Sequence, residues 1–309
     1  MAAATVALIG GTGFIGRHLL ERLTEASPGR IRVLAYGPAP DWLKALSDTE
    51  AVCGDLLDAA SLAPLLDGAD VAINLAGQVS ADVGDYQHVN LGGMITLAQA
   101  CLQHKVRRII HASSALVYGD ALNASEKDPC RPLSPYATLK LAAEEILVRL
   151  LAPAAEVVSL RLTNVYGARQ NKGLMPYLMN RILDQQPITI DSDGAQVRDF
   201  VHVKDVAEAI GKAVVAADCR GVFNIGSGAA TSVIQLVRLF EEVLETPATG
   251  EYRPEHNGGE RRSTVNVGKA LEVLGWQARI ELCDGVRELA DGVRAVLDRR
   301  HARRGGVYA

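Results

Sequence analysis

Tyr136 and Lys140 lie four residues apart in the stretch SPYATLKLAAEE, which runs from Ser134 to Glu145. This stretch opens an amphipathic helical pattern, so the two side chains are expected one turn apart on the same helix face. A phenol ionises near pH 10, and a neighbouring ammonium favours the ionised form. The pair is therefore either a chance feature of a solvated helix or a phenol whose proton an ammonium helps to remove.

A second chemical feature is the glycine pattern IGGTGFIG, which contains Gly10, Gly13 and Gly16. It lies directly between the strand-like run TVALIG and a helical pattern over Phe14–Thr24. Gly10 allows a tight turn, Gly13 lets the backbone approach a pyrophosphate, and Gly16 lets the helix pack close to the strand. The helix N-terminus adds free N–H groups and positive partial charge. The pattern predicts a site for the phosphates of a dinucleotide.

The segment after the second expected strand leaves the kind of dinucleotide open. Tyr36 in VLAYGPAP stands where an aspartate would bind the adenosine ribose of NAD, and no arginine follows at once to mark NADP. We take NAD as the first expectation and NADP as the alternative. Asp55 in GDLLD ends a third short strand, where it is either an adenine contact or an ordinary turn aspartate.

The elements that must position these residues alternate between strand and helix through the first half of the chain. Further strands are expected over Ile31–Tyr36, Asp70–Ala76, Arg107–Ser113 and Glu156–Leu162, and further helices over Ala59–Leu66 and Met94–His104. This alternation predicts an α/β protein with a doubly wound parallel sheet of the Rossmann type. Ligands are then expected at the carboxyl ends of the strands, where the strand order reverses.

The pattern changes after about Gly167, where glycine, proline and polar residues become more frequent. We expect a dinucleotide-binding Rossmann domain over residues 1–168 and a smaller substrate-binding α/β region over residues 169–309. VFNIGSG, from Val222 to Gly228, has the pattern of one more strand. Residues 199–226 are therefore expected to return to the first domain.

Composition limits the classes of partner. The chain has 309 residues, 22% of them charged, and a net charge of −4, so no field draws it to nucleic acid or to an anionic membrane. Its five cysteines are scattered and lack CxxC spacing, which argues against a disulfide framework or a metal site and fits a reducing cytosol. Without an apolar run of about 18 residues or a signal-peptide pattern, we expect a cytoplasmic protein.

Several motifs occur in an order that resembles a known family. They are the glycine loop, GDLLD, NLAG, SSALVYG, YATLK and RLTNVYG, followed by QVRDFVHVKDVAEAI and FNIGSG, and they span nearly the whole chain. The chain resembles the extended short-chain dehydrogenase/reductases, the NAD(P)-dependent nucleotide-sugar epimerases and dehydratases that include UDP-glucose 4-epimerase. The resemblance implies a nucleotide-sugar substrate. It also implies a homodimer formed through Met94–His104 and Pro135–Leu151, although burial within the monomer explains these apolar helices nearly as well.

The resemblance implies that Ser114, Tyr136 and Lys140 form the catalytic set. Removing a hydride from a sugar carbon requires the hydroxyl proton to leave in step, and a tyrosine phenolate favoured by Lys140 and a positive nicotinamide ring can take that proton. Ser114 would orient the same hydroxyl, unless it is only a strand-end turn serine. The residues implied for dinucleotide binding are Gly10, Gly13, Phe14, Ile15, Gly16, Asp55, Leu56, Leu75, Ala76, Gly77, Asn90, Tyr136 and Lys140.

Substrate binding is implied for Ser114 and Tyr136 and for three residues further along the chain. Asn164 in RLTNVYG and Arg198 in QVRDF resemble residues that hold the substrate phosphates, with a structural cap and an ion pair with Asp199 as the respective alternatives. His256 stands where many members carry a second phosphate-binding arginine. Arg261 or Arg262 could replace that function.

The neighbours of Ser114 bear on the reaction. Members that eliminate water carry an Asp–Glu pair after the catalytic Ser/Thr, and here those positions are Ala115 and Leu116. The first expectation is therefore an epimerase acting at C4, which oxidises a sugar hydroxyl and returns the hydride to the opposite face. The alternative is an NADPH-dependent nucleotide-sugar 4-ketoreductase. A dehydratase, a decarboxylase and a non-catalytic dinucleotide sensor rank behind both.

Overall fold

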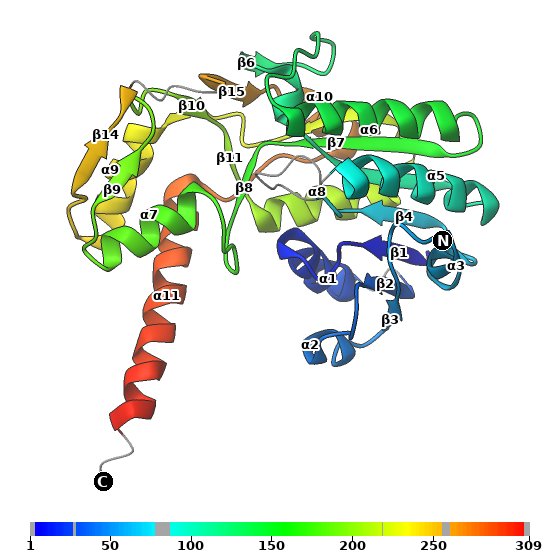
Figure 1. Cartoon of the computed structure of the whole chain (residues 1–309), viewed down its shortest axis with the longest axis horizontal. Coiled ribbons are helices and arrows are strands. Elements are labelled where there is room, and N and C mark those ends of the chain that lie inside the picture. The colour runs from blue at the N-terminus through cyan, green and yellow to red at the C-terminus, as the bar shows by residue number, and fades with distance from the viewer. Residues whose placement is uncertain (1–3, 27–28, 78–86, 218, 255–259, 306–309) are drawn as a thin grey trace.

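The computed structural model describes residues 4–26, 29–77, 87–217, 219–254 and 260–305, with side chains described up to residue 295. Seven parallel strands form its central sheet: β1 (Val6–Ile9), β2 (Ile31–Ala35), β3 (Thr49–Cys53), β4 (Val71–Asn74), β5 (Arg108–Ser114), β7 (Glu156–Leu162) and β12 (Gly221–Ile225). Their order across the sheet is β12-β7-β5-β4-β1-β2-β3. Figure 1 labels β7, β4, β1, β2 and β3 of this sheet. The order reverses between β1 and β4, and this point is where doubly wound sheets bind ligands.

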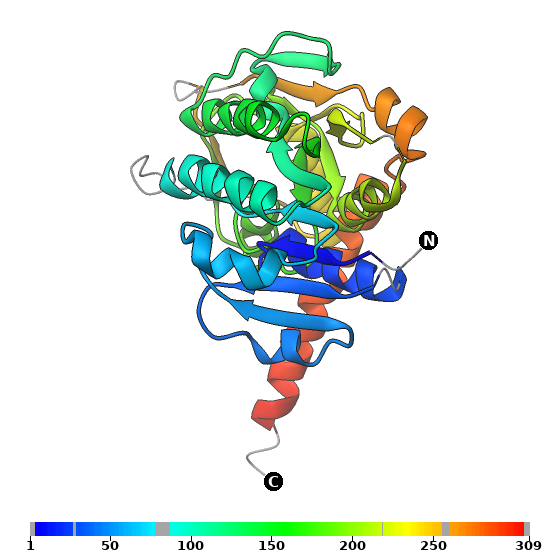
Figure 2. The ribbon, with the colours of Figure 1, turned by 90° about the vertical axis from the view of Figure 1, so that its right-hand side faces the viewer.

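Helices cover both faces of this sheet (Figures 1 and 2). One face packs against α1 (Phe14–Ala26) and α8 (Val203–Val215), with the short α2 (Asp41–Lys44) and α10 (Gly268–Leu274) beside them. The other packs against α3 (Ala59–Leu66), α5 (Gly93–Gln103) and α6 (Pro135–Leu151). Because apolar cores lie on both faces, every residue of β1 and β4 is buried, as expected for continuous apolar strands in a parallel sheet.

The rest of the described chain adds small sheets, three α-helices and two short helices of other types. Its elements are η1 (His88–Gly92), η2 (Ala115–Tyr118), β6 (Ala121–Ala124), β8 (Asn164–Tyr166), α7 (Leu174–Leu183), β9 (Ile188–Ile190), β10 (Val197–Arg198), β11 (Phe200–His202), β13 (Thr231–Ser232), α9 (Val233–Leu244), β14 (Gly250–Tyr252), β15 (Arg262–Val265) and α11 (Leu282–Gly305). Leu178, Phe240 and Val286 belong to a separate apolar core formed by α7, α9 and α11. The later turns of α11 extend away from the body (Figure 1).

The expected fold class is confirmed. The helix expected over Phe14–Thr24 continues to Ala26. The elements expected over Ala59–Leu66 and Glu156–Leu162 have the predicted bounds, and most others differ at their ends by a few residues. The segment that was expected to return does pair with the main sheet, because β12 lies beside β7 and α8 contacts α1. On this packing we propose the division into residues 1–168 with 199–226, and the remainder of 169–309. None of the described helices combines the length and apolarity needed to span a membrane.

Candidate active site

The start of α6 places Tyr136 and Lys140. Ser134 caps the helix, its hydroxyl accepting a hydrogen bond from the Ala137 N–H at 3.3 Å, and Pro135 occupies the first turn. The Lys140 side chain is buried and donates from Nζ to the Ala112 carbonyl of β5 at 2.8 Å. Its Nζ lies 5.9 Å from the centre of the Tyr136 ring. The helix thus directs both groups to the carboxyl end of β5.

Ser114, the last residue of β5, meets this pair. Its hydroxyl oxygen accepts a hydrogen bond from the Leu116 N–H at 3.2 Å and is also hydrogen-bonded to Tyr136. Ser114 therefore has the hydrogen bond of a strand-end turn serine and also contacts the phenol. Ala115 and Leu116 follow Ser114, so the chain presents no acid at these two positions, and Ala115 is buried.

Burial dominates the electrostatics of the pair. It raises the pKa of the Tyr136 phenol, while the hydrogen bond with Ser114 acts in the lowering direction. It lowers the pKa of Lys140 to about 8, and the nearby Glu144 carboxylate acts in the raising direction. Sequence reasoning considered the positive charges of Lys140 and of a nicotinamide ring, and the structure adds a desolvation cost that opposes ionisation of both groups.

The glycine loop connects β1 to α1 beside the end of β4. Gly10 has φ +78°, and a Cβ there would lie 2.7 Å from the Ala76 nitrogen. A Cβ on Gly16 would collide with the Gly10 carbonyl. Gly13 is exposed, and its N–H bonds back to the Gly10 carbonyl at 3.1 Å. The loop therefore leaves open backbone at the N-terminus of α1, the geometry that accommodates a pyrophosphate.

A cleft of about 400 Å³ joins the glycine loop to Tyr136 and Lys140. The predicted residues that line it are Gly10, Gly13, Phe14, Ile15, Gly16, Leu75, Gly77, Ser114, Tyr136 and Lys140. Among the described residues, its charged side chains are lysines and no carboxylate takes part. Open backbone at one end and a phenol–ammonium pair at the other suit a long anionic ligand with a reactive end, and a nicotinamide dinucleotide fits this description.

Comparison with known proteins agrees with this geometry. The model of the NAD-dependent epimerase/dehydratase family matches residues 6–226. The chain is also 33% identical to the UDP-glucose 4-epimerase of Mycolicibacterium smegmatis, over 92% of this chain and 97% of that protein. This chain belongs to the NAD-dependent epimerase/dehydratase family.

Two further relatives show the range of the family. The chain is 28% identical to a dTDP-glucose 4,6-dehydratase of Actinoplanes sp., over 94% of this chain and 98% of that protein. It is 31% identical to MoeE5 in a solved complex with UDP-glucuronic acid and NAD, with a TM-score of 0.85 and coverage of 95% of this chain and 99% of that one. The epimerase/dehydratase family thus includes enzymes of both reaction types.

Asn164 and Arg198, the expected phosphate-binding residues, lie on neighbouring segments beyond the cleft. The Asn164 side-chain amide donates to the Asp199 carbonyl at 3.1 Å. The Arg198 guanidinium donates to the carbonyls of Val197 at 3.0 Å and Glu260 at 2.8 Å. Asp199 instead accepts hydrogen bonds from Ser227, Gly228 and Thr163. The alternative in which Arg198 pairs with Asp199 is therefore wrong.

Four other residues that were predicted to bind the dinucleotide lie behind the cleft or away from it. Asp55 accepts a hydrogen bond from the Leu57 N–H at 2.9 Å, the geometry of the turn alternative. Leu56 is buried in the core beside α3 and α5. The Ala76 N–H donates to Asn74 at 3.0 Å, and Asn90 is buried next to Gly77.

The two arginines considered for a second phosphate contact are each paired with an aspartate. His256 lies outside the described residues. Arg261 is paired with Asp193 at 2.9 Å, and Arg262 with Asp120 at 3.2 Å. Both arginines are half exposed, so these ion pairs are weak and a competing phosphate can displace them.

Sequence reasoning missed part of the cleft wall. Thr163 and the segment Gln170, Asn171 and Lys172 also line the cleft. A cluster of polar residues directly after RLTNVYG is the signal that could have identified them. The Ala168 carbonyl accepts a hydrogen bond from the His18 ring nitrogen Nε2 at 2.9 Å. This bond holds the segment near α1.

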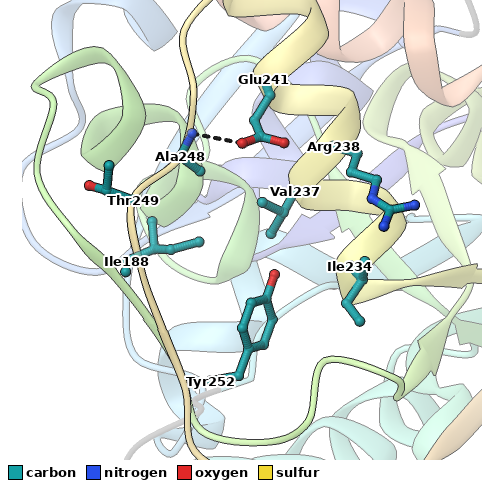
Figure 3. Close-up of a pocket in the computed structure, with 9 residues that line it drawn as sticks. Ile188, Ile234, Val237, Arg238, Glu241, Ala248, Thr249 and Tyr252 are labelled. Carbon is teal, nitrogen blue, oxygen red and sulfur yellow. Dashed lines mark hydrogen bonds between the residues drawn. The ribbon is translucent and has the colours of Figure 1, made fainter.

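A second pocket lies between α9, β9 and β14 (Figure 3). Ile188, Ile234, Val237 and Tyr252 form much of its wall, and Glu241 accepts a hydrogen bond from the Ala248 N–H at 2.8 Å. It contains none of the residues predicted for catalysis or for cofactor binding. We therefore assign the chemistry of this family member to the cleft at the carboxyl ends of the strands.

Proposed function

We propose that this chain is an NAD-dependent nucleotide-sugar epimerase acting at C4. The observation that carries the proposal is the single cleft that joins the glycine loop to Ser114, Tyr136 and Lys140 without a carboxylate among its described lining residues. Water elimination calls for an additional acid and base, and Ala115 and Leu116 supply neither. Epimerisation needs only one proton acceptor and donor, which Tyr136 provides.

The residues act on one sugar hydroxyl. Tyr136 takes its proton as the carbon–hydrogen bond breaks, and gives the proton back when that bond re-forms on the opposite face. Lys140 favours the phenolate through its charge, and Ser114 orients the hydroxyl and then the ketone oxygen. The glycine loop and Lys140 would hold NAD, which would supply a reversible hydride acceptor. Because the hydride returns, the overall reaction consumes no cofactor.

The proposed substrate carries a nucleoside diphosphate. Asn164 and Arg198 lie close together on β8 and β10, and Arg198 is bonded to carbonyls and not to a carboxylate. Burial lowers the pKa of its guanidinium, a cost that a bound diphosphate would offset. The named activities of the relatives, UDP-glucose 4-epimerase and binding of UDP-glucuronic acid, support this class.

The first test has two parts. Protein purified without added cofactor is denatured, and any released dinucleotide is identified by mass spectrometry. The protein is then incubated with UDP-glucose and UDP-glucuronic acid, and C4 epimers are separated by chromatography. Near-stoichiometric NAD together with a C4 epimer supports the proposal. Empty protein that consumes NADPH with a 4-ketosugar refutes it.

That refuting outcome would favour the second candidate, an NADPH-dependent 4-ketoreductase. One observation favours it: Tyr36, at the position expected for the ribose-binding acid, is 85% exposed just after β2. Because Tyr36 stands there in place of a carboxylate, this position would not repel the 2′-phosphate of NADP.

We also propose a homodimer through α5 and α6. These adjacent helices carry four of the exposed large apolar side chains, namely Ile95, Leu102, Val148 and Leu150. These side chains are exposed in the single chain, and a dimer interface would bury them. Light scattering after size-exclusion chromatography should show a dimer, and Val148→Asp should convert it to a monomer. A monomeric wild-type chain would contradict this assignment.

A further inference from the structure

Glu144 lies one turn after Lys140 on α6 and is almost completely buried, at 4% exposure. Its two carboxylate oxygens accept hydrogen bonds from Arg161 of β7, from Nε at 3.1 Å and from Nη2 at 2.7 Å. The hydroxyl of Ser113 in β5 donates to the same carboxylate. One side chain therefore connects α6 to the carboxyl ends of two neighbouring strands.

The groups attached to Glu144 are next to the groups that line the cleft. Ser113 lines the cleft and precedes Ser114. Arg161 precedes Leu162 and Thr163, which also line it, and its guanidinium lies 4.7 Å from the centre of the Tyr118 ring. Such fixed bidentate pairs resist sliding of one element past another.

We propose that Glu144 is a positioning residue for the catalytic pair. Its carboxylate holds α6 against the ends of β5 and β7, and it supplies the negative charge that keeps the Lys140 ammonium protonated in a buried site. The inference rests on the proposed function and deepens it, because it explains how a buried lysine can remain charged beside Tyr136.

The other groups around Lys140 do not supply this charge. Tyr136 on α6 is a neutral phenol whose pKa burial raises, and His111 on β5 is held neutral because burial and the Lys140 charge lower its pKa. The Ala112 carbonyl is a dipole, and Asn90 from η1 is neutral. Arg161 from β7 is positive and neutralises part of the carboxylate. Glu144 is thus the acidic group that favours the ammonium among these neighbours.

The consequence can be calculated. With its pKa at about 8, Lys140 is mostly protonated at neutral pH. An opposite charge nearby shifts a pKa by about one unit or more, so its loss should lower the pKa of Lys140 by about one unit. At pH 8 the protonated fraction would then fall about fivefold. The rate that depends on the ammonium should fall by the same factor, with its alkaline limb displaced to lower pH.

The direct test is an NMR titration of ¹³C-labelled lysine in the full chain, with the Lys140 signal assigned by its loss in Lys140→Arg. Glu144→Gln keeps the shape and should lower the Lys140 midpoint by about one unit. The matched control is Glu145→Gln, because Glu145 is exposed and pairs only loosely with Arg149, at 3.5 Å. This readout needs no substrate, so it stands even if the proposed function fails.

Glu144→Gln leaves Arg161 buried without its counter-ion and could prevent folding. The double variant Glu144→Gln/Arg161→Gln replaces the ion pair with two neutral amides and should show a smaller shift in the same direction. An unchanged Lys140 midpoint in a folded variant overturns the proposal. So does failure of both variants to fold, since the pair would then be required only for stability. If Glu144→Gln shifts the Lys140 midpoint as expected but the wild-type protein epimerises no nucleotide sugar, the proposed function alone is overturned.

Discussion

Replacing Tyr136 by phenylalanine removes one hydroxyl from the cleft and leaves the ring in place. Ser114 keeps its hydrogen bond from the Leu116 N–H, so no buried partner is left unpaired. Stability should therefore fall by only about 1 kcal/mol, the net value of one hydrogen bond. General acid–base catalysis contributes about 10²- to 10⁴-fold, so kcat should fall by that factor, about 3–5 kcal/mol in the barrier. KM should change little, because the ring still fills its site.

The assay is epimerisation of UDP-glucose followed by chromatography, with thermal unfolding measured on the same samples. Tyr177→Phe is the matched control, because Tyr177 lies on α7, away from the cleft. Its hydroxyl accepts a hydrogen bond from the Thr189 N–H at 2.7 Å. That variant should lose as much stability or more while it keeps its kcat. A Tyr136→Phe protein that retains more than about a tenth of kcat would refute the assignment of Tyr136 as the proton acceptor.

Three other outcomes are expected. Lys140→Met should lower kcat about 100-fold. It should also raise the free energy of unfolding at pH 7 by about 2 kcal/mol. The reason is that the pKa of Lys140 in the folded protein, about 8, lies below its ordinary value of 10.5, so the buried charge destabilises the wild type below pH 8. Urea titrations should show wild-type stability rising between about pH 8 and 10.5 and no such rise in the variant. Gly16→Ala should abolish dinucleotide retention in the mass-spectrometric assay, since its Cβ collides with the Gly10 carbonyl, whereas Gly211→Ala, with open space around the added atom, should retain the dinucleotide. Arg198→Ala should raise KM for the nucleotide sugar about tenfold or more with kcat nearly unchanged, and unaltered calorimetric binding of UDP would contradict its role.

Much of the fold could be predicted because its signals are local. Strand and helix periods with glycine between them predict the parallel sheet, and the helix face that carries Tyr136 and Lys140 follows from their spacing. The limits of that reasoning appear at Asp55 and Arg198. Asp55 caps its own turn, and Arg198 bonds to the Glu260 carbonyl, 62 residues away in sequence, which no local pattern indicates.

By itself, the sequence determined the glycine loop, the shared face of Tyr136 and Lys140 on α6 and the absence of an acid after Ser114, since each depends on residue type and short spacing. Only the tertiary structure decided that Lys172 lines the same cleft as the glycine loop and that Glu144 pairs with Arg161. It also decided the directions of the Tyr136 and Lys140 pKa shifts. The reason is physical: burial and long-range contacts depend on which elements pack together, and packing is a property of the whole chain.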